Sequence, residues 1–430
     1  MSTPDAASRR DFLKTSSLAV ASSTVLTSLS IGRSAHAAGD DTLKIGLVGC
    51  GGRGTGAAAQ ALNADKNVKL VAMGDAFADR LDGSLANLAG DPQLAAKIDV
   101  PKERQFVGFD AYKQVIDSGV DVVLLCTPPG FRPQQFKYAI DKGKHVFTEK
   151  PVATDAPGVR SVLATAEEAK KKGLAVVSGL CYRYDFPKRE TIKRIHDGAI
   201  GDVMTMHVSY NTGTLWHHGR KPEWSEMEYQ MRNWLYFNWL SGDFNVEQHV
   251  HSLDKAAWVM KDEPPVRATG LGGRQVRVED QWGHIYDHMA VIYEYKNGAR
   301  LFANCRQIAG CSVDVSDYIY GTKGTAELMR GTIEPIGGEK WRYRGDMPNM
   351  YDQEHRELFG SIRSGNPINN GDYMCKSTMM GIMGRMVCYT GRTLTWDECL
   401  NSTENLQPAK YEWGPMPTPP VAKPGITPFA

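Results

Sequence analysis

The chain has 430 residues, of which 42% are hydrophobic, so it is long enough for two domains with substantial cores. With 50 basic and 49 acidic residues, the formal net charge is +1, which gives no electrostatic support for nucleic-acid binding. No run of about 18 apolar residues follows the N-terminal segment, so we expect no membrane span in the rest of the chain. The eight cysteines are scattered without a C-x-x-C motif, so neither a metal site nor a disulfide framework is indicated.

Residues 1–37 have the three parts of an export signal. Arg9 and Arg10 form a twin-arginine pattern, a weakly apolar stretch covers residues 15–31, and Ala35-His36-Ala37 is a small-x-small cleavage site. We therefore expect the mature chain to begin at Ala38 and to work in the periplasm or otherwise outside the inner membrane. The twin-arginine export machinery carries folded cargo, so a cofactor can be inserted before export and remain tightly bound.

A glycine-rich loop predicts a dinucleotide site. The loop reads G-C-G-G-R-G at residues 49–54, follows the apolar run 43–48 and precedes a segment of small residues with helical character. In this strand, turn and helix context, the glycines permit the tight turn, the close approach of a pyrophosphate and the packing of helix on strand. The predicted cofactor contacts in this loop are Gly49, Cys50, Gly51, Gly52, Arg53 and Gly54.

The second predicted strand, residues 68–73, is followed by Asp75 about 20 residues beyond the loop, at the spacing of an acid that binds the adenosine ribose hydroxyls. A carboxylate there would repel a 2'-phosphate. The sequence therefore favours NAD over NADP.

Strands and helices alternate as far as residue 180, as a doubly wound parallel sheet requires, and we assign residues 38–180 to an NAD(P)-binding Rossmann domain. Thr127, Pro128 and Pro129 follow the strand at 122–126 and form a turn beside the cofactor. Glu149 and Lys150 follow the strand at 145–147, and ligands in such sheets lie at the carboxyl ends of strands. Both are therefore predicted to lie in the cofactor site.

The pattern changes after residue 180. Strand-like segments at 203–210, 266–271, 284–295, 299–307, 318–320 and 324–329 indicate a mostly antiparallel sheet with helices on one face. Helical periodicity covers residues 351–363 and 374–389. We assign residues 181–407 to an α+β domain for substrate binding and oligomerisation, and the proline-rich residues 408–430 to an extended surface tail.

Hydride transfer from a CH–OH carbon needs a group that takes the hydroxyl proton. Lys150 can take it, or can hydrogen-bond the substrate oxygen while another residue takes the proton. Residues 243–261 read as a single helix on which Glu247, His251 and Asp254 share one face, beside the apolar stripe.

Tyr182 and Arg183 lie at the start of the second domain, where they can bind substrate hydroxyls, although an interdomain ion pair explains Arg183 equally well. The aromatic-rich segments 216–220 and 234–239 can form a platform for a sugar ring or can belong to the core.

The glycine loop, the Glu149-Lys150-Pro151 triplet and the helix bearing His251 together resemble the Gfo/Idh/MocA family, named for glucose-fructose oxidoreductase and inositol dehydrogenase. This resemblance covers the chain from about residue 43 to the tail. It implies a Rossmann domain, an open and mostly antiparallel sheet, and a sugar, polyol or glycoside bound between the domains. It also implies that Glu247 and His251 handle protons and that the protein is a homo-oligomer. The family commonly has aspartate where this chain has Glu247, which leaves the role of the acid open.

The leading hypothesis is an exported NAD-dependent oxidoreductase that acts on a secondary hydroxyl, with Lys150, Glu247 and His251 as catalytic residues and Tyr182, Arg183 and His251 as substrate contacts. If NAD cannot exchange outside the cytoplasm, the reduced cofactor must be reoxidised in place. One alternative is therefore an NAD-dependent glycoside hydrolase that works by transient oxidation, elimination and hydration without net redox change. A non-catalytic sugar-binding sensor is a third.

Overall fold

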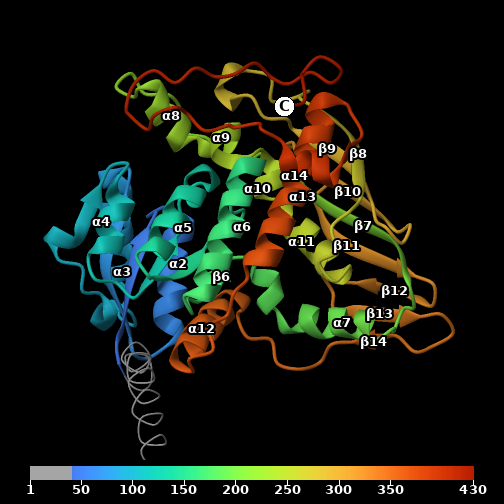
Figure 1. The fold of residues 1–430 in the computed structure, drawn as a ribbon, viewed down its shortest axis with the longest axis horizontal. Helices are drawn as coiled ribbons and strands as arrows, with labels where there is room; N and C mark the ends of the chain where they lie inside the picture. Colours follow the sequence, from blue (N-terminus) through green and yellow to red (C-terminus); the bar gives the residue numbers. More distant parts are fainter. Residues whose placement is uncertain (1–40) are drawn as a thin grey trace, which may run out of the picture.

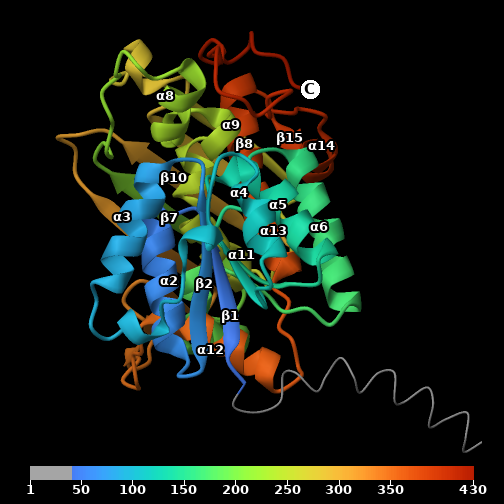
Figure 2. The same cartoon turned by 90° about the vertical axis from the view of Figure 1, so that its left-hand side faces the viewer.

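The computed structural model describes residues 41–430. The predicted twin-arginine signal and its cleavage site lie outside these residues. The described chain forms two sheets, one in each domain, which lie side by side with helices between them (Figures 1 and 2).

The first domain contains a six-stranded parallel sheet with strand order β3-β2-β1-β4-β5-β6, which confirms the predicted Rossmann topology. The strands are β1 (Leu43–Val48), β2 (Val68–Asp75), β3 (Gln105–Val107), β4 (Val122–Leu125), β5 (His145–Thr148) and β6 (Val176–Ser178). The helices are α2 (Gly52–Ala64), α3 (Ala78–Ala89), α4 (Ala111–Asp117), α5 (Arg132–Asp141) and α6 (Ala156–Lys171).

Both faces of this sheet are covered, because its strands are apolar on both sides. Side chains of α2 and α3 pack against one face and those of α4, α5 and α6 against the other. Parallel strands buried on both faces read as nearly continuous apolar runs, as β1 and β4 do. This is why the sequence alone located these strands.

The second domain contains a nine-stranded, mostly antiparallel sheet, with strand order β14-β13-β12-β11-β7-β10-β9-β8-β15 and one parallel pair, β7 with β10. The strands are β7 (Val203–Thr212), β8 (Arg267–Gly273), β9 (His288–Glu294), β10 (Arg300–Gln307), β11 (Asp314–Gly321), β12 (Gly324–Glu327), β13 (Thr332–Pro335), β14 (Trp341–Arg342) and β15 (Leu394–Thr395). The helices are α7 (Phe186–His196), α8 (Glu226–Arg232), α9 (Asn238–Ser241), α10 (Phe244–Glu247), α11 (Val250–Val259), α12 (Met350–Arg363), α13 (Gly371–Thr390) and α14 (Trp396–Asn401).

Helices α11 and α13 pack on one face of this sheet, as expected, and the other face carries exposed side chains such as Leu271 and Phe302. After β14 the chain returns to the first domain. Helix α12 packs against α2, and the Val176 amide donates to the Ile368 carbonyl at 2.7 Å. The C-terminal part of the chain therefore fixes the two domains against each other.

One predicted helix is interrupted. Residues 243–261, expected to be continuous, form α10 and α11 with a break between Glu247 and Val250. Asp243 precedes α10 with a positive φ of 78°, and its buried carboxylate accepts hydrogen bonds from the Tyr389 hydroxyl at 2.5 Å and the Tyr286 amide at 3.0 Å. These tertiary contacts fix the start of α10, and helical periodicity cannot reveal them.

Candidate active site

A cavity of about 690 Å³ lies between the two domains at the carboxyl ends of the parallel strands. The first domain lines it with the glycine loop, Asp75, the turn after β4 and Lys150, and the second domain lines it with Glu247 and His251. The tertiary structure thus brings together residues that lie about 200 positions apart in the sequence.

The glycine loop forms an open cradle at the start of α2. Gly49 adopts a φ of 93°, and a Cβ on Gly54 would lie 1.8 Å from the Gly49 carbonyl oxygen, so neither position accepts a side chain without a shift of the backbone. A Cβ on Gly51 or Gly52 would meet no heavy atom of the surrounding structure within 4 Å, and both residues line the cavity. The free space, the exposed backbone and the helix N-terminus fit a dinucleotide pyrophosphate.

Asp75 is held at the end of β2 by backbone amides. Its two carboxylate oxygens accept hydrogen bonds from the amides of Cys50 (2.6 Å) and Phe77 (2.9 Å). Burial raises the pKa of Asp75, while these two bonds act in the opposite direction. Because each oxygen keeps a further lone pair, the fixed carboxylate can still accept bonds from ribose hydroxyls.

Lys150 is joined to the second domain through Glu247. Its Nζ lies 2.8 Å from Glu247 Oε1 and 2.6 Å from the Glu247 carbonyl oxygen, and both side chains are largely buried. Two acceptors at this distance fix the ammonium group in a single orientation toward the cavity. The Lys150–Glu247 pair therefore connects the cofactor domain to the substrate domain at the predicted site of chemistry.

His251 lines the same cavity from α11. Its ring meets the Tyr182 ring edge-on with centroids 5.5 Å apart, and its Nδ1 has no hydrogen-bond partner among the described residues. Burial lowers the pKa of His251 well below its ordinary value, and the nearby Lys150 charge acts in the same direction. The imidazole is therefore neutral at neutral pH and can accept a proton.

Arg53 connects the glycine loop to the strand that carries Lys150. Its guanidinium forms an ion pair with Glu149, whose other carboxylate oxygen accepts the Lys150 backbone amide at 3.2 Å. Glu354 of α12 lies 3.6 Å from the same guanidinium, and burial raises the pKa of Glu354 well above its ordinary value. The loop that was predicted to bind the cofactor thus also supports the main chain of Lys150.

Several predicted site residues lie outside the cavity lining. Arg183 is buried and pairs with Asp254 (2.8 Å) and Asp262 (2.6 Å). All three residues belong to the second domain, so Arg183 forms an ion pair within that domain and not the interdomain pair that the sequence allowed. Asp254 is buried between Arg183 and Ser377, which both donate to its carboxylate, so it does not line the cavity with Glu247 and His251 as the predicted helix face implied. Tyr182 contacts the site through the His251 ring.

The lining includes neither Cys50 nor Pro129. The buried Cys50 side chain packs against the Gly74 carbonyl, 3.5 Å from its Sγ, and its amide donates to Asp75. Pro129 is buried and follows Thr127 and Pro128, which do line the cavity.

Other residues that line the cavity were not predicted from the sequence. Arg132 is buried and donates to the carbonyls of Thr127 (2.6 Å) and Pro151, and so joins the two turns that carry predicted site residues. Gln248 lies in the break between α10 and α11, and Tyr210 lies near the end of β7. Arg132 could have been predicted as a site residue, because it is a basic residue directly after the turn at 127–131. No sequence feature marks Gln248 as a site residue.

Two family models match the chain. The model for an oxidoreductase family with an NAD-binding Rossmann fold covers residues 43–178, and the model for the GFO/IDH/MocA C-terminal domain covers residues 189–327. The chain belongs to the Gfo/Idh/MocA family of oxidoreductases. This confirms the family and the two-domain fold that the sequence motifs indicated.

Known proteins resemble the chain over most of its length. Inositol 2-dehydrogenase 3 of Saccharopolyspora erythraea is 24% identical over 75% of this chain and 86% of its own. Aldose-aldose oxidoreductase from Caulobacter crescentus, solved with glycerol, superposes with a TM-score of 0.63 at 19% identity, over 82% of this chain and 99% of its own. GenD2 from gentamicin A biosynthesis, solved with NAD, superposes with a TM-score of 0.63 at 18% identity, over 83% and 96% of the two chains.

None of the helices in residues 41–430 is long and apolar enough to cross a membrane. The eight cysteines, all within these residues, are unpaired.

Proposed function

We propose that the protein transfers hydride between NAD and the CH–OH carbon of a sugar, polyol or glycoside in the cavity between its domains. The observation that carries this proposal is the Lys150–Glu247 pair, which lies in the same cavity as the glycine loop and Asp75. One relative is an inositol 2-dehydrogenase and one structural neighbour is an aldose-aldose oxidoreductase. Both support the proposal that the substrate carries several hydroxyl groups.

The roles of the side chains follow from their contacts. NAD, when bound, supplies the hydride acceptor. Lys150, oriented by two oxygens of Glu247, donates a hydrogen bond to the substrate oxygen and polarises it. His251, neutral and in the same cavity, takes the hydroxyl proton as the carbonyl forms and returns it in the reverse direction.

We further propose that NAD is used in preference to NADP. The Asp75 carboxylate is fixed in the cavity by two amides and cannot turn away from a 2'-phosphate without losing those bonds. This supports the selectivity that the spacing of Asp75 from the glycine loop predicts.

The test is turnover by the purified protein on a panel of inositols, aldoses and glycosides, followed by reduced nicotinamide and by product analysis. Lys150→Met should lower kcat by roughly 10²-fold to 10⁴-fold, the range for positioned acid–base groups. Lys170→Met, at an exposed position on α6, is the matched control and should leave turnover unchanged. Wild-type activity from the Lys150→Met variant would remove Lys150 from the mechanism. No turnover of any panel member by the wild type would favour the sensor hypothesis.

We also propose export through the twin-arginine pathway, on the sequence of residues 1–37 alone. Replacing Arg9 and Arg10 by lysine in a full-length fusion should keep the protein in the cytoplasm. Unchanged export of that variant would contradict the proposal.

A further inference from the structure

Side chains of the second domain lie against the adenosine half of the cavity. In a Rossmann domain the acid at the end of β2 binds the adenosine ribose, so its neighbours flank the adenosine. Phe77, Arg80 and Phe109 line the cavity in this region. Two segments, residues 215–235 of the second domain and residues 411–416 of the C-terminal tail, contact these side chains or their immediate neighbours. We call these two segments the adenosine cover.

The first segment is attached by charge and by ring contacts. Arg232 of α8 donates to both carboxylate oxygens of Asp79 at 3.1 Å, and its guanidinium lies 4.1 Å from the centre of the Phe77 ring. Arg80 lies 3.3 Å from the Nε2 atom of His218. A bidentate pair and a cation–π contact at the same arginine hold α8 against the start of α3.

The second segment belongs to the C-terminal tail, which the sequence predicted to be a surface strap and which runs past α8 and α9 (Figure 1). The Trp413 ring lies 4.5 Å from the Phe109 ring and 5.4 Å from the Phe77 ring, measured between centroids. Tyr411 lies 5.2 Å from Phe131, which also lines the cavity. The tail therefore packs directly on residues that form the cavity wall.

The two segments are joined to each other. The Met227 amide donates to the Gly414 carbonyl at 3.0 Å, and the Gln230 side chain donates to the Met416 carbonyl at 2.8 Å. Movement of one segment away from the first domain therefore requires movement of the other, or the loss of these bonds.

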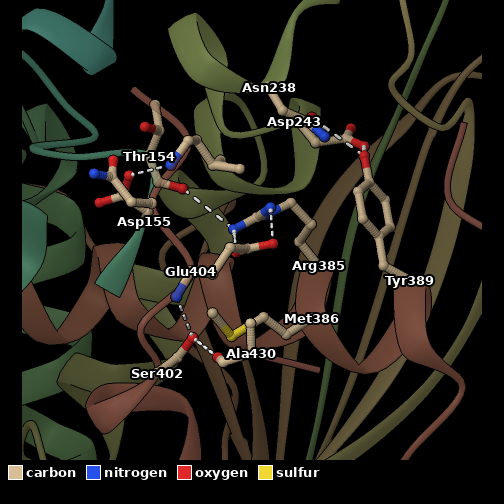
Figure 3. Close-up of polar contacts among 12 residues, drawn as sticks. Thr154, Asp155, Asn238, Asp243, Arg385, Met386, Tyr389, Ser402, Glu404 and Ala430 are labelled. Atoms are coloured by element: carbon tan, nitrogen blue, oxygen red, sulfur yellow. Dashed lines mark hydrogen bonds and ion pairs between the residues drawn. The ribbon is translucent and has the colours of Figure 1, made fainter. Parts of the chain in front are cut away.

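The tail is also tethered at its base and at its end. Glu404 pairs at 2.6 Å with Arg385, which is 1% exposed, and the Ser402 hydroxyl donates to the main-chain oxygen of Ala430 (Figure 3). Residues 402–430 thus form a closed loop that leaves and returns at the same point. Such a loop holds its middle section in place with far less freedom than an open tail would have.

We propose that the adenosine cover is a cofactor-binding element that encloses the adenosine of NAD and retains the cofactor through repeated turnovers. This inference rests on the proposed use of NAD. It gives the tail and residues 215–235 a role in cofactor retention, distinct from the proton handling of Lys150 and His251.

Retention has a consequence for the reaction. Electrons taken from an alcohol that becomes a carbonyl must be returned in the same site, to a carbonyl compound that becomes an alcohol. The two halves can occur on two substrates, an alcohol and an aldose or ketose. They can also occur on one glycoside at two stages, with elimination and hydration between them.

The test measures cofactor content and exchange. Wild-type protein purified without added cofactor is denatured and its NAD is quantified per chain, and a second sample is incubated with isotopically labelled NAD to follow exchange. Trp413 is 45% exposed, so its truncation should leave the fold intact. Loss of its two ring contacts in Trp413→Ala should speed exchange by roughly 10-fold to 100-fold. Trp413→Phe should retain slow exchange, and Trp341→Ala, on distant β14, is the matched control.

We expect near-stoichiometric NAD with slow exchange in the wild type, and faster exchange only in Trp413→Ala and Arg232→Ala. Equal exchange rates in all variants would overturn the role of the cover. An empty wild-type protein that oxidises polyols only with added NAD would overturn retention and leave the proposed function standing. Retained NAD without turnover of any alcohol would instead contradict the proposed function while the cover remains supported.

Discussion

Replacement of Asp75 by serine should reverse or abolish the preference for NAD. The carboxylate is fixed by the Cys50 and Phe77 amides at 2.6 and 2.9 Å, and it lines the cavity where the adenosine ribose is expected. Serine keeps one acceptor for these amides but carries no charge. Arg80, which lines the same region, would then be available to pair with a 2'-phosphate.

The size of the effect follows from the charges. Two unit charges about 4 Å apart interact by about 4 kcal/mol at an effective dielectric constant near 20. That energy corresponds to about three decades of affinity, and solvent screening and Arg80 reduce it, so we expect a wild-type preference of roughly 10²-fold. Losing a charged hydrogen bond to the ribose costs about 1.5–3 kcal/mol. NAD should therefore bind Asp75→Ser roughly 10-fold to 100-fold more weakly, while NADP binds more tightly than before.

The assay is titration of cofactor-free protein with each dinucleotide, followed by the fluorescence of the reduced nicotinamide. Asp82→Ser, at an exposed position on α3, is the matched control for loss of a nearby negative charge. If the wild type binds NADP as tightly as NAD, or if Asp75→Ser and Asp82→Ser change the ratio equally, the electrostatic argument is wrong.

Two further predictions concern buried charge. Burial lowers the pKa of His251 well below its usual range, so the base stays neutral until the pH drops through that lowered pKa, and the acid limb of kcat/KM should lie well below the ordinary histidine range. A limb at the ordinary histidine pKa that persists in His251→Asn would exclude this residue as the base. Lys255 and Asp317 are fully buried and form an ion pair with 2.6 Å between Nζ and Oδ2. Lys255→Met should therefore lower the free energy of unfolding by about 3–5 kcal/mol, as measured by denaturant unfolding, and the added change Asp317→Leu should restore much of that loss. A double variant as unstable as the single one would refute that explanation.

The first domain was largely predictable because its signals are local. The strands at 43–48 and 122–125 are short apolar runs, and the glycine loop and Asp75 lie at the spacing that the Rossmann turn and strand require. Helix α6 also has a local signal at its start, since Asp155 caps its N-terminus by accepting the Gly158 amide at 2.8 Å.

The second domain was predictable only in outline. Strands β13, β14 and β15 went unrecognised, because they contain two to four residues and depend on pairing with neighbours. The predicted strand at 284–295 begins at His288, since Asp287 turns back to accept the amides of Gln275, Val276 and Arg277.

The family, the cofactor domain and the candidate residues Lys150, Glu247 and His251 could be identified from the sequence, because each depends on the spacing of residues within a short segment. The contact of Glu247 with Lys150, the buried ion pair of Arg183 and the packing of the tail on Phe77 and Phe109 became visible only in the folded chain. These contacts join segments far apart in the chain. Their formation depends on how the two sheets and the intervening helices pack, which no local pattern encodes.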